Sequence, residues 1–184
     1  AGIAPELSLY DCHSCHHEMS DVRWGGLRLK QGLAPGGLRL QDNHMLMLRS
    51  VGAVVSSSDA AALDAQIRKL LIAGQTGYPQ TRAAAAELSQ WLNGRKAAWL
   101  GRNFTAADIR AVRKSIAKQG ADGQLNDFAA AEQAFYGIES LSYYVDDVDR
   151  LQTVLDKLFA SVEDETKYKP ASFRAACNAA LASL

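Results

Sequence analysis

The fold class is decided by the stretch Ser58-Asp59-Ala60-Ala61-Ala62-Leu63-Asp64-Ala65-Gln66-Ile67-Arg68-Lys69-Leu70-Leu71-Ile72-Ala73-Gly74. Its large apolar residues recur at the spacing that places side chains on one face of an α-helix: Leu63, Ile67, Leu70 and Leu71. Ser58 and Asp59 are typical of a helix start, and Gly74 is typical of a helix end. The stretch therefore predicts an amphipathic helix that closes at Gly74.

The same periodicity predicts five more helices, over about residues 81–100, 105–120, 128–138, 148–162 and 170–184. Thr105 to Asp108 has the pattern of a capping box, and Pro79 and Gly101 flank the helix before it. No alternating run of β-branched residues indicates a strand. Because the connections are short, we expect an all-α fold in which consecutive helices pack antiparallel, as a bundle or as stacked hairpins.

Composition narrows the function classes. The chain has 184 residues, 48% of them hydrophobic, which is enough for one well-formed core. Its 20 basic and 20 acidic residues balance, so nothing favours nucleic acid or an anionic membrane as the partner. No apolar run approaches the length of a membrane span. The sequence opens at Ala1 without an initiator Met, and we expect a mature form or a fragment of a longer protein.

One short motif indicates a chemistry. Residues 10–17 read Tyr-Asp-Cys-His-Ser-Cys-His-His and contain Cys-x-x-Cys-His, the attachment sequence of c-type haem. On one helical turn Cys12 and Cys15 can form thioethers to the two haem vinyl groups, while His16 directs its imidazole at the iron. These three residues are the predicted attachment and proximal-ligand site of a single haem c.

Three other uses of the two cysteines compete with haem attachment. A thioredoxin-like pair would follow a buried strand, which residues 1–11 do not resemble. A zinc site would need further ligands, and only His44 or Cys177 could join without crowding. A disulfide is the third alternative in an exported chain. Cys177 itself falls on the apolar stripe of the last helix, so we predict that it is a core thiol.

All histidines and methionines lie between residues 13 and 47, so the iron chemistry is confined to the first quarter of the chain. Residues 25–37 hold five glycines and a proline, a composition that favours a loop wrapped around a flat ligand. Apolar residues for the porphyrin edge are Trp24, Leu27, Leu29, Leu33 and Leu38. Cationic residues that could pair with the propionates are Arg23, Arg28, Lys30 and Arg39.

The sixth iron ligand is predicted to be His44, on a helix that Asp42 or Asn43 could cap. Met45 and Met47 are the rivals, with ordinary apolar packing as the alternative for both. His17 could serve the iron of a neighbouring haem, lie in solvent or bond a haem propionate. His13 is expected to be exposed.

The phrase from Tyr10 to Met19, followed by Trp24 and the Gly/Pro-rich stretch, resembles the last haem-binding segment of multihaem c-type cytochromes of the cytochrome c554-like kind, which can continue into a helical C-terminal region. The resemblance covers about 40 residues and implies haem attachment at Cys12 and Cys15 with His16 as proximal ligand. This chain departs from that family in having a single attachment motif, so a sixth ligand from outside the chain is also possible.

The sequence thus predicts a haem c attachment segment over residues 1–50 and an α-helical bundle over residues 51–184. The expected function is electron transfer outside the cytoplasm, for example in a periplasm, to a redox partner protein or a neighbouring haem domain, without catalysis by the chain itself. One alternative is a gas-binding or peroxide-reactive sensor with an open distal site. Another is a non-haem helical interaction domain with structural zinc.

Overall fold

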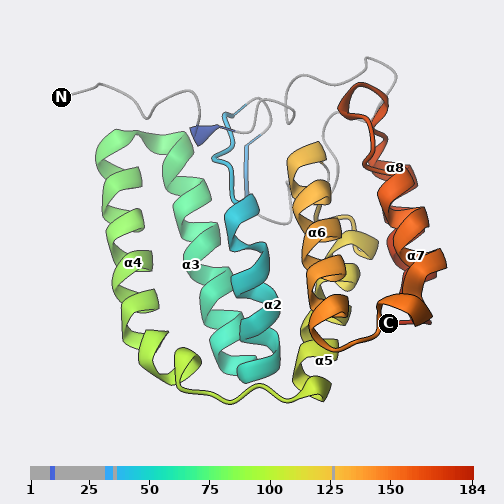
Figure 1. Ribbon diagram of the computed structural model, residues 1–184. Helices are drawn as coiled ribbons and strands as arrows, with labels where there is room; N and C mark the ends of the chain where they lie inside the picture. Colours follow the sequence, from blue (N-terminus) through green and yellow to red (C-terminus); the bar gives the residue numbers. More distant parts are fainter. Residues whose placement is uncertain (1–8, 11–31, 35–36, 126) are drawn as a thin grey trace. The chain divides into compact units, whose positions relative to one another are not determined.

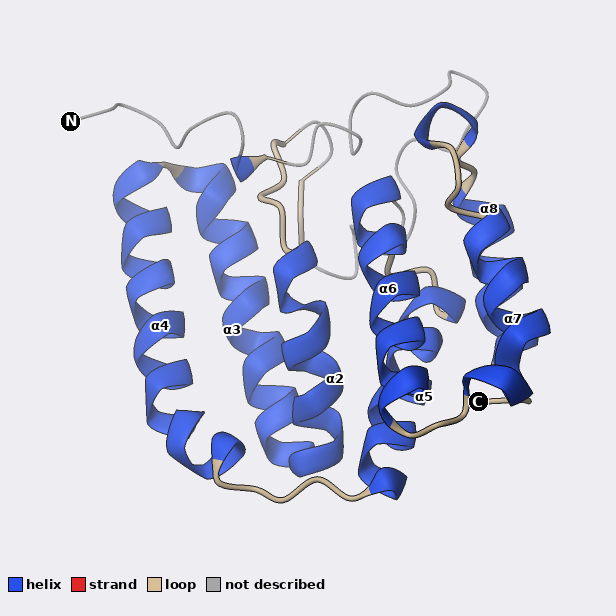
Figure 2. Cartoon of the chain, viewed as in Figure 1, coloured by secondary structure: helices blue, strands red, loops and turns tan. Residues whose placement is uncertain are grey.

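The computed structural model describes residues 9–10, 32–34, 37–125 and 127–184. Within these ranges the chain forms seven α-helices and two short 3-10 helices, and its extended pairing is limited to an isolated bridge between Tyr10 and Leu40 (Figures 1 and 2). The prediction of an all-α fold is confirmed. No helix among these residues combines the length and apolar character that crossing a bilayer requires.

The chain divides into two compact units. The first comprises Ala1–Asp42 and Val55–Asn103 and contains α3 (Ser57–Thr76) and α4 (Tyr78–Leu100). The second comprises Asn43–Val54 and Phe104–Leu184. Its elements are η3 (Asn43–Met45), α2 (Leu46–Val55, whose last residue falls in the first unit), α5 (Ala106–Ala121), α6 (Phe128–Tyr144), α7 (Val148–Ala160), η4 (Glu165–Lys167) and α8 (Pro170–Ala180). The predicted boundary at residue 50 rests on the haem-binding role of the first segment, and it stays a prediction.

In the first unit α3 and α4 lie side by side as an antiparallel hairpin (Figure 1). The predicted apolar stripe of α3 is buried at Leu63, Ile67 and Leu71. At the far end of the hairpin, the Trp99 indole Nε1 donates a hydrogen bond to Asp59 Oδ2 at 3.0 Å. Asp59 thus ties the end of α4 to the first turn of α3.

The end of α3 differs from the prediction. The helix continues through Gly74 to Thr76, and Gly77 caps it. A Cβ on Gly74 would lie 2.7 Å from Leu40 Cδ1, so this glycine allows Leu40 to approach the helix. Gly77, with φ 153°, adopts the backbone conformation that ends the helix, and Pro79 fits the first turn of α4 directly after it. The predicted capping box of α5 is confirmed by hydrogen bonds between Thr105 and Asp108.

In the second unit α5 contacts both α6 and α8, and α7 contacts α6 and α8. Leu46 from α2 joins the same apolar core, and Ser50 Oγ accepts a hydrogen bond from Gln119 Nε2 at 2.7 Å. Cys177 is fully buried there as a free thiol, which confirms the prediction of a core residue. Burial raises the pKa of Cys177 to about 12, so this sulfur is protonated and inert near neutral pH.

Gly120 allows α5 and α8 to approach closely. A Cβ at this position would lie 2.4 Å from Cys177 Sγ and 3.1 Å from Phe173 Cε1, both in a filled core. We therefore expect Gly120→Ala to destabilise the protein by about 1–3 kcal/mol through overpacking. The free energy of unfolding in urea, followed by circular dichroism, measures the effect.

Gly94 provides the matched control, because it lies on the exposed side of α4 with nothing within 4 Å of an added Cβ. Gly94→Ala should stabilise the protein by up to about 1 kcal/mol through helix propensity. Adding Cys177→Ala to Gly120→Ala should recover part of the loss. An unchanged stability in Gly120→Ala would contradict the close approach of the two helices.

A buried arginine joins three elements of the second unit. The Arg113 side chain on α5 is fully buried, and its Nη2 lies 3.2 Å from Asp147 Oδ2. Its Nη1 donates to Ser142 Oγ on α6 at 3.1 Å, and Nη2 also approaches the carbonyl oxygen of Leu184 at 3.4 Å. Asp147 additionally pairs with the more exposed Arg110 and Arg150. One carboxylate thus anchors three guanidinium groups.

Candidate functional site

The residues predicted to bind the haem, Cys12, Cys15 and His16, lie outside the described residues, as do His13, His17 and Met19. The same holds for part of the predicted haem surroundings, namely Trp24, Leu27, Leu29, Arg23, Arg28 and Lys30. The structure therefore bears on the predicted site through His44, the two methionines beside it and the described part of the glycine-rich loop.

Two of the predicted loop contacts are altered by what the structure describes. Leu33 is only 2% exposed and thus belongs to the protein interior, whereas Leu38 is 54% exposed and remains available to a ligand. Arg39 forms an ion pair with Asp42, and both side chains are largely buried. Because its guanidinium already has a carboxylate partner, Arg39 is a weaker candidate for a haem propionate than an unpaired cation would be.

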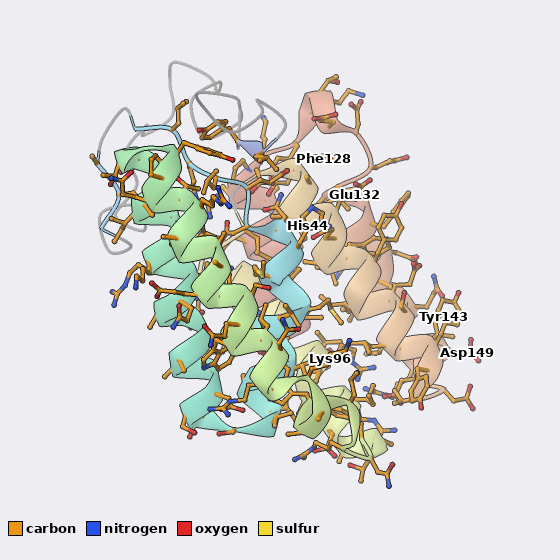
Figure 3. All side chains as sticks on the ribbon, turned by 90° about the vertical axis from the view of Figure 1, so that its left-hand side faces the viewer. His44, Lys96, Phe128, Glu132, Tyr143 and Asp149 are labelled. Carbon is orange, nitrogen blue, oxygen red and sulfur yellow. The ribbon has the colours of Figure 1, made fainter. Side chains whose placement is uncertain are left out.

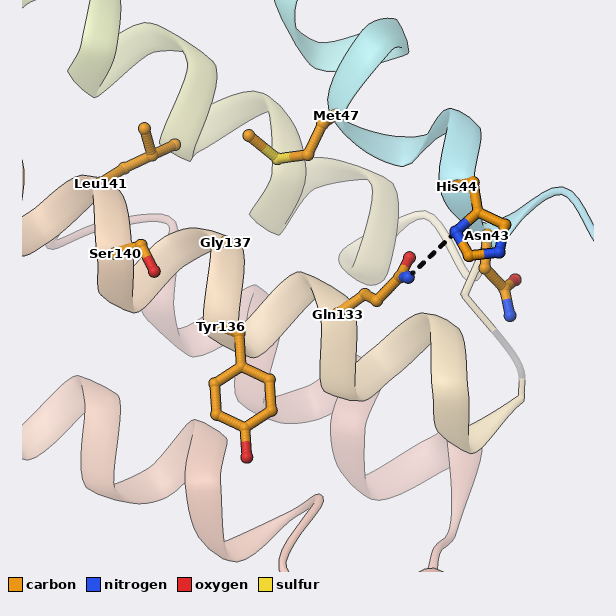
Figure 4. Close-up of a pocket in the computed structure, with 8 residues that line it drawn as sticks. All are labelled: Asn43, His44, Met47, Gln133, Tyr136, Gly137, Ser140 and Leu141. Carbon is orange, nitrogen blue, oxygen red and sulfur yellow. Dashed lines mark hydrogen bonds between the residues drawn. The ribbon is translucent and has the colours of Figure 1, made fainter.

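His44 lies in η3, and the residue before it, Asn43, fixes the position of this short helix. Asn43 is buried, and its Nδ2 donates to Asp127 Oδ1 at 2.9 Å. The same carboxylate oxygen caps α6 by accepting from the Ala130 backbone N–H at 2.8 Å. Asp127 therefore holds η3 against the start of α6. His44 is exposed and lies next to Asn43 (Figure 4).

The His44 ring has a neighbour that the sequence does not indicate. Gln133 Nε2 on α6 lies 3.5 Å from His44 Nδ1, at the long limit of a hydrogen bond (Figure 4). The two ends of a glutamine amide can exchange by a flip, after which the carbonyl oxygen would accept a hydrogen bond from a protonated Nδ1. In that tautomer Nε2 carries a lone pair and can bind a metal. The sequence separation of 89 between the two residues explains why no sequence pattern reveals the pair.

The two rival methionines follow His44 closely: Met45 is the last residue of η3, and Met47 lies in the first turn of α2. Met47 is 38% exposed, and its Sδ lies 3.3 Å from the position a Cβ on Gly137 would take. Gly137 thus leaves room for Met47 against α6. Met45 is partly buried and does not line the surface cavity that His44 and Met47 border.

His44 and Met47 line a shallow surface cavity of about 370 Å³ together with Gln133 and Tyr136 from α6 (Figure 4). An imidazole and a thioether are both ligands of haem iron. Two such donors one helical turn apart can offer one ligand to an iron, but they do not form a closed metal site by themselves. Within the described ranges no group of three His, Cys, Asp or Glu side chains is placed to hold a metal ion.

The structure also bears on the ligands considered for zinc. Cys177 is buried and protonated, which makes it a poor zinc ligand, whereas His44 is exposed.

Comparison of the chain with protein-family models, curated proteins and solved structures found no match.

Proposed function

We propose that this chain carries one covalently bound c-type haem and transfers electrons, as a module or fragment of a larger redox protein outside the cytoplasm. The observation that carries the proposal is the Cys-x-x-Cys-His motif at residues 12–16. Its partner would be a redox protein or a neighbouring haem domain.

The residues present have the chemistry that attachment requires. The thiols of Cys12 and Cys15 would each add across one haem vinyl group, forming a carbon–sulfur bond while the thiol proton passes to the other vinyl carbon. The His16 imidazole would hold the iron through a nitrogen lone pair. The bound haem supplies a one-electron Fe(III)/Fe(II) couple. In this proposal the helical units provide the scaffold and the docking surfaces.

His44 is the proposed sixth ligand. Its support is an exposed imidazole on a helix start held by Asn43 and Asp127, with Gln133 next to the ring nitrogen that would carry the proton. Binding by two imidazoles would keep the iron six-coordinate and limit its reorganisation during electron transfer.

A direct test is the intact mass and visible spectrum of the chain after expression with haem-maturation machinery. The proposal requires a mass increase of one haem that persists after acid-acetone extraction, together with the pyridine haemochrome band of c-type haem. A colourless protein with only its polypeptide mass would refute it and leave the zinc alternative. Rapid carbon monoxide binding with a high-spin ferric form would favour the alternative of an open, gas-binding or peroxide-reactive haem.

His44→Ala tests the sixth ligand. We expect the ferric spectrum to change from low-spin to high-spin, because removal of the imidazole leaves the distal position to water or vacant. Met47→Leu is the matched control, since it removes the other ligand-type side chain of the same cavity while keeping its volume. If His44→Ala stays low-spin and Met47→Leu becomes high-spin, the ligand is Met47. If neither changes, Met45 or a group outside this chain takes the role.

A further inference from the structure

The outer face of α6 and α7 combines aromatic and acidic side chains. Tyr136 and Phe159 are 51% and 43% exposed, and each ring lies against the buried Phe135, at centroid distances of 5.3 and 5.5 Å. These rings border a concavity of about 270 Å³ between the two helices. Exposed aromatic rings around a hollow are typical of recognition surfaces.

Two carboxylates line the same concavity. Glu139 follows Tyr136 by one helical turn on α6, and Asp156 precedes Phe159 by one turn on α7. Asp156 accepts a hydrogen bond from Gln152 Nε2 at 2.8 Å, which holds it at the rim. Among the described residues, no lysine or arginine forms a salt bridge with Glu139 or Asp156. The negative charge of the concavity is therefore available to an external cation.

The acidic character extends beyond the concavity. Residues 128–163 contain seven acidic and two basic side chains, although the whole chain is neutral. One of the seven, Asp147, is already paired with three arginines and does not add to the negative charge of this surface. Glu132 lies near the start of α6, and Tyr143 and Asp149 lie near its end and at the start of α7 (Figure 3). Tyr143 is 64% exposed. The surface thus extends further than the binding of one small cation requires. Its negative charge disfavours the binding of nucleic acid and of anionic lipid.

We propose that the α6–α7 face binds a basic segment of a partner protein, and that one arginine or lysine of that segment enters the concavity. There the cation would lie against the faces of Tyr136 and Phe159 and pair with Glu139 and Asp156. Cation–π contact and charge pairing both favour this occupant over a neutral one. The proposal concerns residues 128–163 alone and does not depend on haem.

The probe for this site is an alanine-based helical peptide with arginine and leucine along one face, titrated at low ionic strength into the 184-residue chain. Its control is the same peptide with citrulline, which keeps the shape of arginine but has no charge. We expect the arginine peptide to bind about tenfold more tightly or better, since one cation–π contact and one charge pair together supply about 1.4 kcal/mol. Raised salt should weaken it.

The variant Glu139→Gln with Asp156→Asn should weaken the arginine peptide about tenfold while the citrulline peptide is unaffected. The charge-matched control is Glu87→Gln with Asp122→Asn, which removes two carboxylates from exposed ion pairs on other helices. That control should bind like the original chain. Tyr136→Leu keeps an apolar side chain but removes the ring face, and it should weaken the arginine peptide about threefold.

Backbone amide shifts in NMR spectra should place the peptide on α6 and α7. If the Glu87/Asp122 control variant weakens peptide binding as much as the Glu139/Asp156 variant does, the proposal is overturned, because the effect then depends only on overall charge. Equally tight binding of free N-acetylarginine amide would identify a small-molecule site instead of a protein-docking face. A concentration-dependent dimer in sedimentation that is lost in the variant Glu139→Gln with Asp156→Asn would assign the face to a second copy of the chain. That result would also overturn the proposal.

Discussion

A chain with both Cys12→Ala and Cys15→Ala is expected to carry no covalent haem after expression with the maturation machinery. The two thioethers are the only bonds that would survive acid-acetone extraction, because the His16–iron bond is reversible. Its intact mass should be lower by one haem than that of the original sequence expressed in the same way, and the extracted polypeptide should be colourless. This is the largest effect that the proposed function predicts.

Cys177→Ala is the matched control for that experiment. Its thiol is fully buried in the core of the second unit and its pKa is raised to about 12, so it has no route to a vinyl group. This variant should keep the haem mass and the spectrum. Covalent haem in the Cys12/Cys15 variant, or its loss in Cys177→Ala, would contradict the assignment of the attachment residues.

The largest expected change in stability comes from Asp147→Asn. The substitution leaves the guanidinium of Arg113 buried with only its contacts to Ser142 Oγ and the Leu184 backbone oxygen. Removing one partner of a buried ion pair costs about 3–5 kcal/mol. The Asp147 side chain is itself 13% exposed, which favours the lower end, about 3 kcal/mol. Urea unfolding followed by circular dichroism measures the loss.

A double-mutant cycle isolates the ion pair from the packing. Arg113→Met with Asp147→Asn should lose less stability than the two single substitutions together, because no unpaired charge then remains buried. Asp122→Asn breaks an exposed pair with Lys118 and should cost about 0.5 kcal/mol or less. Additive effects of Arg113→Met and Asp147→Asn would show that the two residues do not interact.

The same carboxylate predicts a pH dependence. Hydrogen bonds from Arg110, followed by those from Arg150 and Arg113, lower the pKa of Asp147 far below the ordinary value of 3.8. Because the folded pKa is the lower one, the ionised carboxylate stabilises the protein fully above the pKa of the unfolded state, near 4. That contribution is lost as the pH falls toward the folded pKa. The stability difference between the original chain and Asp147→Asn should therefore be constant above about pH 5 and shrink below about pH 4.

Local features of the chain were predictable because their causes lie within a few residues. The stripe of Leu63, Ile67 and Leu71 and the capping box of Thr105 and Asp108 depend on side chains within one or two helical turns. Gly74 shows the limit of such reasoning. Glycine favours both a helix end and a close approach, and only the position of Leu40 distinguishes the two.

For the candidate site, too, only the features that depend on neighbouring residues were predictable. The chemistry of Cys12, Cys15 and His16 is proposed from spacing alone, since three residues on one helical turn can bind one haem without help from the rest of the chain. The surroundings of His44 could not be predicted, because Gln133 and Asp127 come from distant sequence. No short-range pattern indicates which side chains a folded bundle brings together.

The sequence by itself therefore determined the helical class and the start of several helices, because helix periodicity and capping act through neighbours in the chain. Only the tertiary structure decided that Arg113 pairs with Asp147, that Cys177 packs against Gly120, and that α6 and α7 share an acidic aromatic face. These contacts join residues far apart in sequence. They depend on how whole helices pack, which no single segment specifies.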